Sequence, residues 1–64
     1  MDLPSGSRVR VLNPPDLPFE GFLVDRQPES IDRDNGRQTV RWECLICSRD
    51  RSPVWVPADA VQPA

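Results

Sequence analysis

The sequence contains no histidine, tyrosine or lysine, and these absences limit the chemistry that the chain can perform. Without histidine it lacks the usual acid–base group at neutral pH, the commonest metal ligand and the base that activates serine or cysteine nucleophiles. Its 64 residues leave room for one small domain, which would bury about 60% of the surface that the unfolded chain exposes. We therefore expect a non-enzymatic protein without a cofactor, formed by one domain over residues 1–64 with its core at about 6–62.

Glycine is scarce, and long apolar runs are missing. Three glycines against eight prolines, with no long segment of helical periodicity, favour short strands joined by stiff loops. The longest apolar stretches, Phe22–Val24 and Cys44–Cys47, are far too short to cross a bilayer. The start at Met1–Pro4 has neither the cationic nor the apolar region of a signal peptide. These features predict a cytoplasmic protein without membrane insertion, at most peripheral on the cytosolic side of a membrane complex.

Alternating polar and apolar residues predict five strands. The expected strands are Ser7–Leu12, Phe22–Gln27 ending at Pro28, Arg37–Cys47, Val54–Val56 and Val61–Gln62. A single helical or 3₁₀ turn is expected at Pro57–Ala60, between the last two strands. This order of elements predicts an all-β fold, a small five-stranded SH3-like barrel with one 3₁₀ turn before the last strand.

Two polar segments separate the first three strands. Residues 13–20 hold three prolines and two acids, which predicts an ordered surface loop pinned by Leu17 and Phe19. Residues 29–36 end in Asp34-Asn35-Gly36, a tight-turn signal because Asn and Gly tolerate positive φ, so they are expected to form a hairpin tip. Alternation along the strands then assigns these residues to the core: Val9, Val11, Phe22, Val24, Val40, Trp42, Val54, Val56 and Val61.

Cys44 and Cys47 form the one motif that resembles a redox or metal site, because a Cys-x-x-Cys pair can be half a zinc site or a dithiol. In an extended strand, however, these positions point to opposite faces. Their Cα atoms would lie about 10 Å apart, beyond the limit of about 7 Å for a disulfide. We expect two free thiols. Zinc shared with a partner chain, a redox pair and an intermolecular disulfide are the alternatives.

The eight basic residues are all arginines, against ten Asp and Glu residues, so the net charge is −2. That net charge does not favour extended contact between the protein and a nucleic-acid backbone, but it allows a local patch of arginines. Strand alternation sends Arg10 and Arg41 outward, and Arg49 and Arg51 lie in a charged turn expected at residues 48–53. Guanidinium groups at such positions suit carboxylates or phosphates. The alternative is that these arginines pair with acids of the chain itself.

Trp55 is the apolar candidate for a binding site. Val54 and Val56 take the core positions of their strand, so the indole is expected on the opposite face. There it either anchors an interface or covers the open end of the barrel. With the arginines, it completes a predicted protein-binding site made of Arg10, Arg41, Arg49, Arg51 and Trp55.

Several segments together resemble a known family. They are Gly6–Asp16, Phe19-Glu20-Gly21, Val40-Arg41-Trp42-Glu43 after Gly36, and Val54–Val61. These motifs are similar to those of subunit S of the photosynthetic NAD(P)H dehydrogenase-like complex of cyanobacteria and chloroplasts. The resemblance implies an SH3-like accessory subunit that helps to dock acidic ferredoxin through basic residues. The chain departs from the family at Cys44–Arg51, which stands in place of a glycine-rich turn that contains tryptophan.

Other SH3-like families share parts of the pattern. An SH3-like subunit of photosystem I has the same order of strands, and KOW and Tudor-like modules of transcription or translation factors also open with Gly-x-x-Val-Arg-Val and reach a glycine after an aromatic loop. In signalling SH3 domains an aromatic residue that stacks on ligands stands where this chain has Ala60, so proline-rich peptides are not the expected ligand. Two hypotheses remain: a docking subunit for an acidic protein, and a KOW or Tudor-like nucleic-acid module, which the pI of about 4.8 disfavours.

Overall fold

A computed structural model describes residues 3–14 and 17–64, and these residues form five antiparallel strands and one 3₁₀ turn. The elements are β1 (Arg8–Val11), β2 (Phe19–Asp34), β3 (Arg37–Ser48), β4 (Arg51–Pro57), η1 (Ala58–Ala60) and β5 (Val61–Pro63). The prediction of an all-β fold with a 3₁₀ turn before the last strand is confirmed. The order across the sheet is β4-β3-β2-β1-β5, so β4 and β5 form its edges, and the sheet does not close into a barrel within the described residues.

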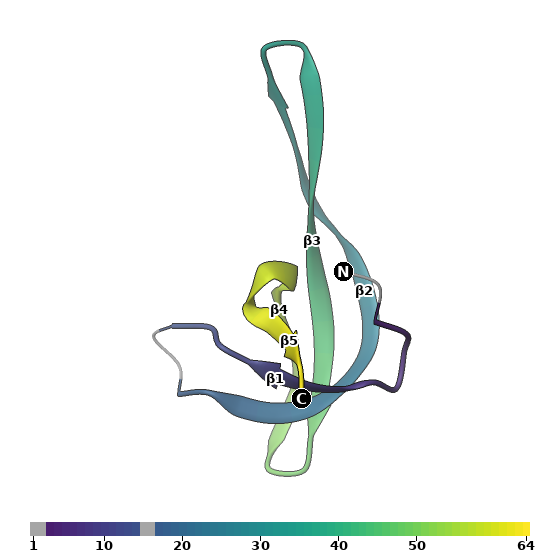
Figure 1. The fold of residues 1–64 in the computed structure, drawn as a ribbon, viewed down its shortest axis with the longest axis vertical. Helices are drawn as coiled ribbons and strands as arrows, with labels where there is room; N and C mark the ends of the chain where they lie inside the picture. The colour runs from purple at the N-terminus through teal and green to yellow at the C-terminus, as the bar shows by residue number, and fades with distance from the viewer. Residues whose placement is uncertain (1–2, 15–16) are drawn as a thin grey trace.

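One cluster of buried side chains holds the five strands together. Its members are at most 3% exposed: Val9, Val11, Leu23, Cys44, Ile46, Val56 and Val61. Because every strand contributes to this one cluster, the sheet curls around it, with β5 lying across the middle of the molecule (Figure 1). The predicted alternation of β1 is confirmed, since Arg8 and Arg10 are exposed beside the buried valines. No helix of the described residues is long and apolar enough to cross a membrane.

The inward face of β2 is the reverse of the prediction. Phe22 and Val24 were expected in the core but are exposed, whereas Gly21 and Leu23 are buried. The register against β3 shifts directly after Leu23, so Val24 is the extra residue of a β-bulge. Ser5 Oγ donates a hydrogen bond to the Val24 carbonyl at 3.2 Å, which ties the segment before β1 to this bulge. Alternation alone does not reveal which face of this strand is buried.

The hairpin of β2 and β3 is much longer than the sequence predicts. Pro28 does not end β2, because the strand continues to Asp34 after a second register shift at residues 28–30. Only Asn35 and Gly36 remain as the turn, with φ of 50° and 77°, as the Asn-Gly signal predicts. The predicted polar tip at residues 29–36 is therefore mostly strand.

Residues 28–42 of this hairpin project beyond the rest of the sheet, and we call them the arm (Figure 1). Pairing of β3 with β4 begins only at Glu43, so the arm has two strands and no third. Val40 and Trp42 were predicted as core residues but are 38% and 45% exposed. They share a face with the buried side chains further along β3, yet they lie past the point where β4 and β5 could cover them. The face was predicted correctly, and its burial was not.

The segment before β2 also differs from the predicted loop. Leu17 is 84% exposed and does not pin the loop, and residues 15 and 16 lie outside the described residues. Phe19 belongs to β2 and packs half-buried against the core cluster. Val54, predicted as a core residue, is also half-buried against that cluster. Both side chains thus lie at the edge of the core.

Gly21 of β2 packs directly against β3 and has no room for a side chain, which suggests a direct test of the packing. A Cβ atom at this position would meet the carbonyl oxygen of Cys47 at 2.6 Å and Cγ2 of Ile46 at 2.8 Å. Because backbone must move to relieve the first contact, Gly21→Ala should lower the free energy of unfolding in urea by about 1–3 kcal/mol. Ser30→Ala, at an exposed position of the same strand, should change it by less than about 0.5 kcal/mol. Equal stabilities for the two variants would contradict this close approach.

Candidate functional site

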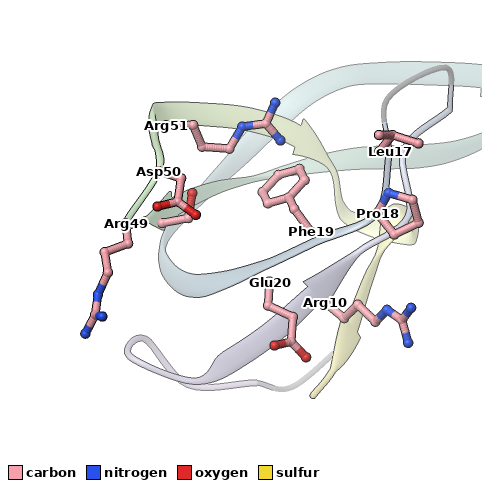
Figure 2. Close-up of a pocket in the computed structure, with 9 residues that line it drawn as sticks. Arg10, Leu17, Pro18, Phe19, Glu20, Arg49, Asp50 and Arg51 are labelled. Atoms are coloured by element: carbon pink, nitrogen blue, oxygen red, sulfur yellow. The ribbon is translucent and has the colours of Figure 1, made fainter.

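Three of the five predicted binding residues line one shallow hollow of about 850 Å³, which we call the arginine hollow (Figure 2). Its lining residues are Arg10, Leu17, Pro18, Phe19, Glu20, Ser48, Arg49, Asp50 and Arg51. They come from β1, from the start of β2 and from the turn between β3 and β4. The hollow therefore joins segments that are far apart in the sequence.

Strand pairing accounts for this assembly. Arg10 lies opposite Glu20 in the pairing of β1 with β2, on the outward face that the alternation of β1 predicts. Ser48 lies opposite Arg51 in the pairing of β3 with β4, so Arg49 and Asp50 alone form the turn. The predicted charged turn at residues 48–53 is thus shorter than expected.

An aromatic ring occupies the centre of the arginine hollow. The guanidinium carbon of Arg51 lies 4.1 Å from the centroid of the Phe19 ring, within the range of a cation–π contact. Figure 2 shows this guanidinium over the ring, with Glu20 on the other side and with Arg10 and Arg49 extending outward at the margins. The ring and the stacked guanidinium form a platform with a rim of charged side chains.

The charges of the hollow are only partly neutralised by the chain itself. Glu20 pairs with Arg8 at 3.6 Å between Nη2 and Oε2, and both side chains are largely exposed. Among the described residues, Arg10, Arg49 and Arg51 form no ion pair. Counted with Arg8, four arginines face the two acids Glu20 and Asp50. Counted over the described residues, the region therefore carries an excess of positive charge on a chain that is acidic overall.

Ser48 supplies one further polar group. Its Oγ atom is buried and has no hydrogen-bond partner among the described residues, although it lies within the lining of the hollow. A buried hydroxyl without a hydrogen-bond partner is less stable than a hydroxyl that water hydrates. The described residues thus leave the hydrogen-bonding capacity of this hydroxyl unused.

The other two predicted residues lie elsewhere. Arg41 is on the arm, where its Nε lies 2.8 Å from Oδ2 of Asp32. Trp55 is on β4 opposite Leu45, 37% exposed, and its outward direction is as predicted because Val56 is buried. The structure thus does not bring the five residues together. Sequence reasoning also missed the central position of Phe19, which becomes visible only through its pairing with β1.

The two cysteines differ in exposure. Cys44 is a member of the buried cluster, whereas Cys47 is half-buried, and both are free, as the strand geometry predicts. Burial raises the pKa of the Cys44 thiol, and the positive charge of Arg26 offsets part of this effect. The described residues contain no group of three or more His, Cys, Asp or Glu side chains arranged to hold a metal ion.

No known protein family, curated protein or solved structure matches this chain. The likeness to subunit S of the NAD(P)H dehydrogenase-like complex therefore rests on the short motifs alone. What the structure establishes is a small all-β domain with a five-stranded antiparallel sheet.

Thiol labelling should separate the two cysteines. At a pH of about 8, a disulfide reagent such as DTNB should modify Cys47 promptly, because the rate of thiol labelling depends on how accessible the thiol is to the reagent and Cys47 is partly exposed. Cys44 should react only as the domain opens or after urea is added, since it is buried and its pKa is raised. Cys47→Ser isolates the buried thiol and serves as the control. Prompt labelling of that variant in native buffer would contradict the burial of Cys44.

Proposed function

We propose that the chain is a non-catalytic docking module whose arginine hollow binds an acidic segment of a protein partner. The observation that carries this proposal is the set of three arginines around the ring of Phe19, Arg10, Arg49 and Arg51, which have no ion pair within the described part of the chain. Guanidinium groups bind carboxylates through two parallel hydrogen bonds, and an adjacent aromatic ring adds apolar contact.

The charge distribution favours a protein partner over a nucleic acid. Glu20 and Asp50 lie among the arginines of the hollow, and the chain as a whole is acidic. A phosphate backbone would meet these carboxylates along its path, whereas a short acidic segment can place its side chains between them. Binding of this kind raises the association rate more than the final affinity and weakens as salt shortens the Debye length.

The finer assignment follows the resemblance described above. On this proposal the curled sheet is of the SH3-like class, supported by the pairing of β1 with β5 and by η1 before the last strand. The chain would then be an accessory subunit of a photosynthetic electron-transfer complex on the cytoplasmic side. Its acidic partner would be ferredoxin, with subunits of the dehydrogenase-like complex as further contacts.

One observation favours the second candidate, a KOW or Tudor-like module that binds nucleic acid. Phe22 is exposed in a smaller hollow that adjoins the first and that Arg8 and Arg49 also line. An exposed ring beside two guanidinium groups is an arrangement on which a base can stack. We rank this candidate second because the stacking surface is a single ring and because the acids Glu20 and Asp50 interrupt the basic surface around it.

Charge reversal at the hollow should weaken docking without unfolding the domain. Arg49→Glu and Arg51→Glu should each lower the affinity for purified ferredoxin, or for a synthetic peptide rich in Asp and Glu, by about tenfold or more at about 0.05 M salt. Arg37→Glu, at the far end of β3, carries the same change of charge and is the matched control. Binding is followed by surface plasmon resonance, and folding by circular dichroism.

The same titration distinguishes the two candidates. Docking on carboxylates is refuted when neither ferredoxin nor the acidic peptide binds the unmodified chain at low salt, or when Arg37→Glu weakens binding as strongly as the variants of the hollow. Binding of a single-stranded RNA oligonucleotide that is lost in a Phe22→Ala variant would move the assignment to the nucleic-acid module.

A further inference from the structure

The arm has two unlike faces, and its polar face is satisfied by the chain itself. Arg41 forms its ion pair with Asp32 there, and Gln27 Nε2 donates a hydrogen bond to Oε1 of Glu43 just below the arm. Such cross-strand pairs are the usual stabilising contacts of a solvated sheet face. This face needs no partner.

The opposite face of the arm is apolar and uncovered. Ile31 lies directly opposite Val40, and Trp42 lies opposite Pro28, in the pairing of β2 with β3. Ile31, Val40 and Trp42 are between 38% and 55% exposed. Further along β3 the same face continues into Cys44 of the core cluster. An isolated two-stranded hairpin is marginally stable in water, so a surface that covers this face would stabilise the arm.

The charges that flank this apolar face are of opposite sign at its two ends. Arg33 lies two residues from Ile31 toward the tip of the arm, opposite Gln38. Glu29 lies two residues from Ile31 toward the base, in a hollow that Val40, Trp42 and Asp59 also line. At about 3.3 Å per residue, Arg33 and Glu29 are about 13 Å apart, too far to pair within one chain.

We propose that the apolar face of the arm binds the same face of a second copy of this chain, antiparallel, about a two-fold axis through the Ile31–Val40 pair. That axis places Ile31 and Val40 against their equivalents, and it brings Arg33 of each copy to Glu29 of the other. The contact is thus self-complementary in shape and charge, as an isologous interface requires. It does not depend on the arginine hollow.

The size of the face sets the strength of this contact. About six residue pairs at about 3.3 Å each, on two strands that together are about 10 Å wide, give a strip of about 200 Å², less than the roughly 800 Å² per partner of a standard stable interface. We therefore expect a reversible dimer with a dissociation constant in the micromolar range or weaker, populated at high protein concentration. The arm and the turn between β3 and β4 lie at opposite ends of the molecule (Figure 1), so the arginine hollow stays accessible in this dimer.

Charge exchange between copies tests the proposal on the full chain. Arg33→Glu and Glu29→Arg should each weaken self-association by about tenfold in analytical ultracentrifugation, because two like-charge contacts replace two opposite ones. An equimolar mixture of the two variants should associate again as a heterodimer, since each Glu then faces an Arg of the unlike copy. Arg37→Glu, a residue of the polar face, should leave association unchanged.

A second readout reports on the apolar contact. In a Trp55→Phe chain, Trp42 is the only indole, and its emission should shift to the blue as the concentration rises. All substituted positions are exposed, so circular dichroism should be the same for every variant. The proposal is overturned when the unmodified chain stays monomeric up to about millimolar concentration, or when it dimerises but the mixed variants fail to associate.

Discussion

The fold depends on one small core, to which all five strands contribute but which none of them fills alone. β2 and β3 are the two longest strands, yet the buried side chains that they supply to this core are Leu23, Cys44 and Ile46. β2 can pass this close to β3 because Gly21 has no side chain to meet the carbonyl of Cys47. Once the core is full, the remaining length of both strands has nothing to pack against. The arm is the consequence of that limit.

The structural features that could be predicted from the sequence are those that depend only on residues close together in the chain. The alternation of β1, the turn at Asn35-Gly36 and the 3₁₀ turn before β5 are local features, and each is found where expected. The inward face of β2 depends on its register against β1, which pairs the buried Val9 with Gly21 and the exposed Arg8 with Phe22, and three consecutive apolar residues at 22–24 do not show this locally. Pro28 was expected to end the strand, but proline is tolerated where the outer edge of a strand is unpaired. Only the extent of the pairing with β1, which ends at Phe22, reveals that this edge is free at Pro28.

The candidate site shows the same division between local and long-range information. The outward direction of Arg10 and the position of Arg49 in a turn follow from the sequence. Their convergence on Phe19 follows from the registers of two separate strand pairs, neither of which is encoded in a short motif. Arg41 has the same side chain and a similar strand position, but it lies on the arm and pairs with Asp32. Residue type therefore identifies candidates, and topology decides which of them can act together.

In our two proposals, the two ends of the molecule bind different partners: one end binds an acidic segment and the other a second copy of the chain. The arginine hollow lies beside the turn between β3 and β4, and the arm projects from the opposite end (Figure 1). Two copies joined through their arms would present two hollows facing away from each other. A partner with one acidic segment would gain nothing from this arrangement, whereas an assembly with two such segments at matching spacing would bind the second hollow at a high effective concentration. A weak arm contact is sufficient for this purpose, because two hollows bound to one such assembly hold the two copies near one another.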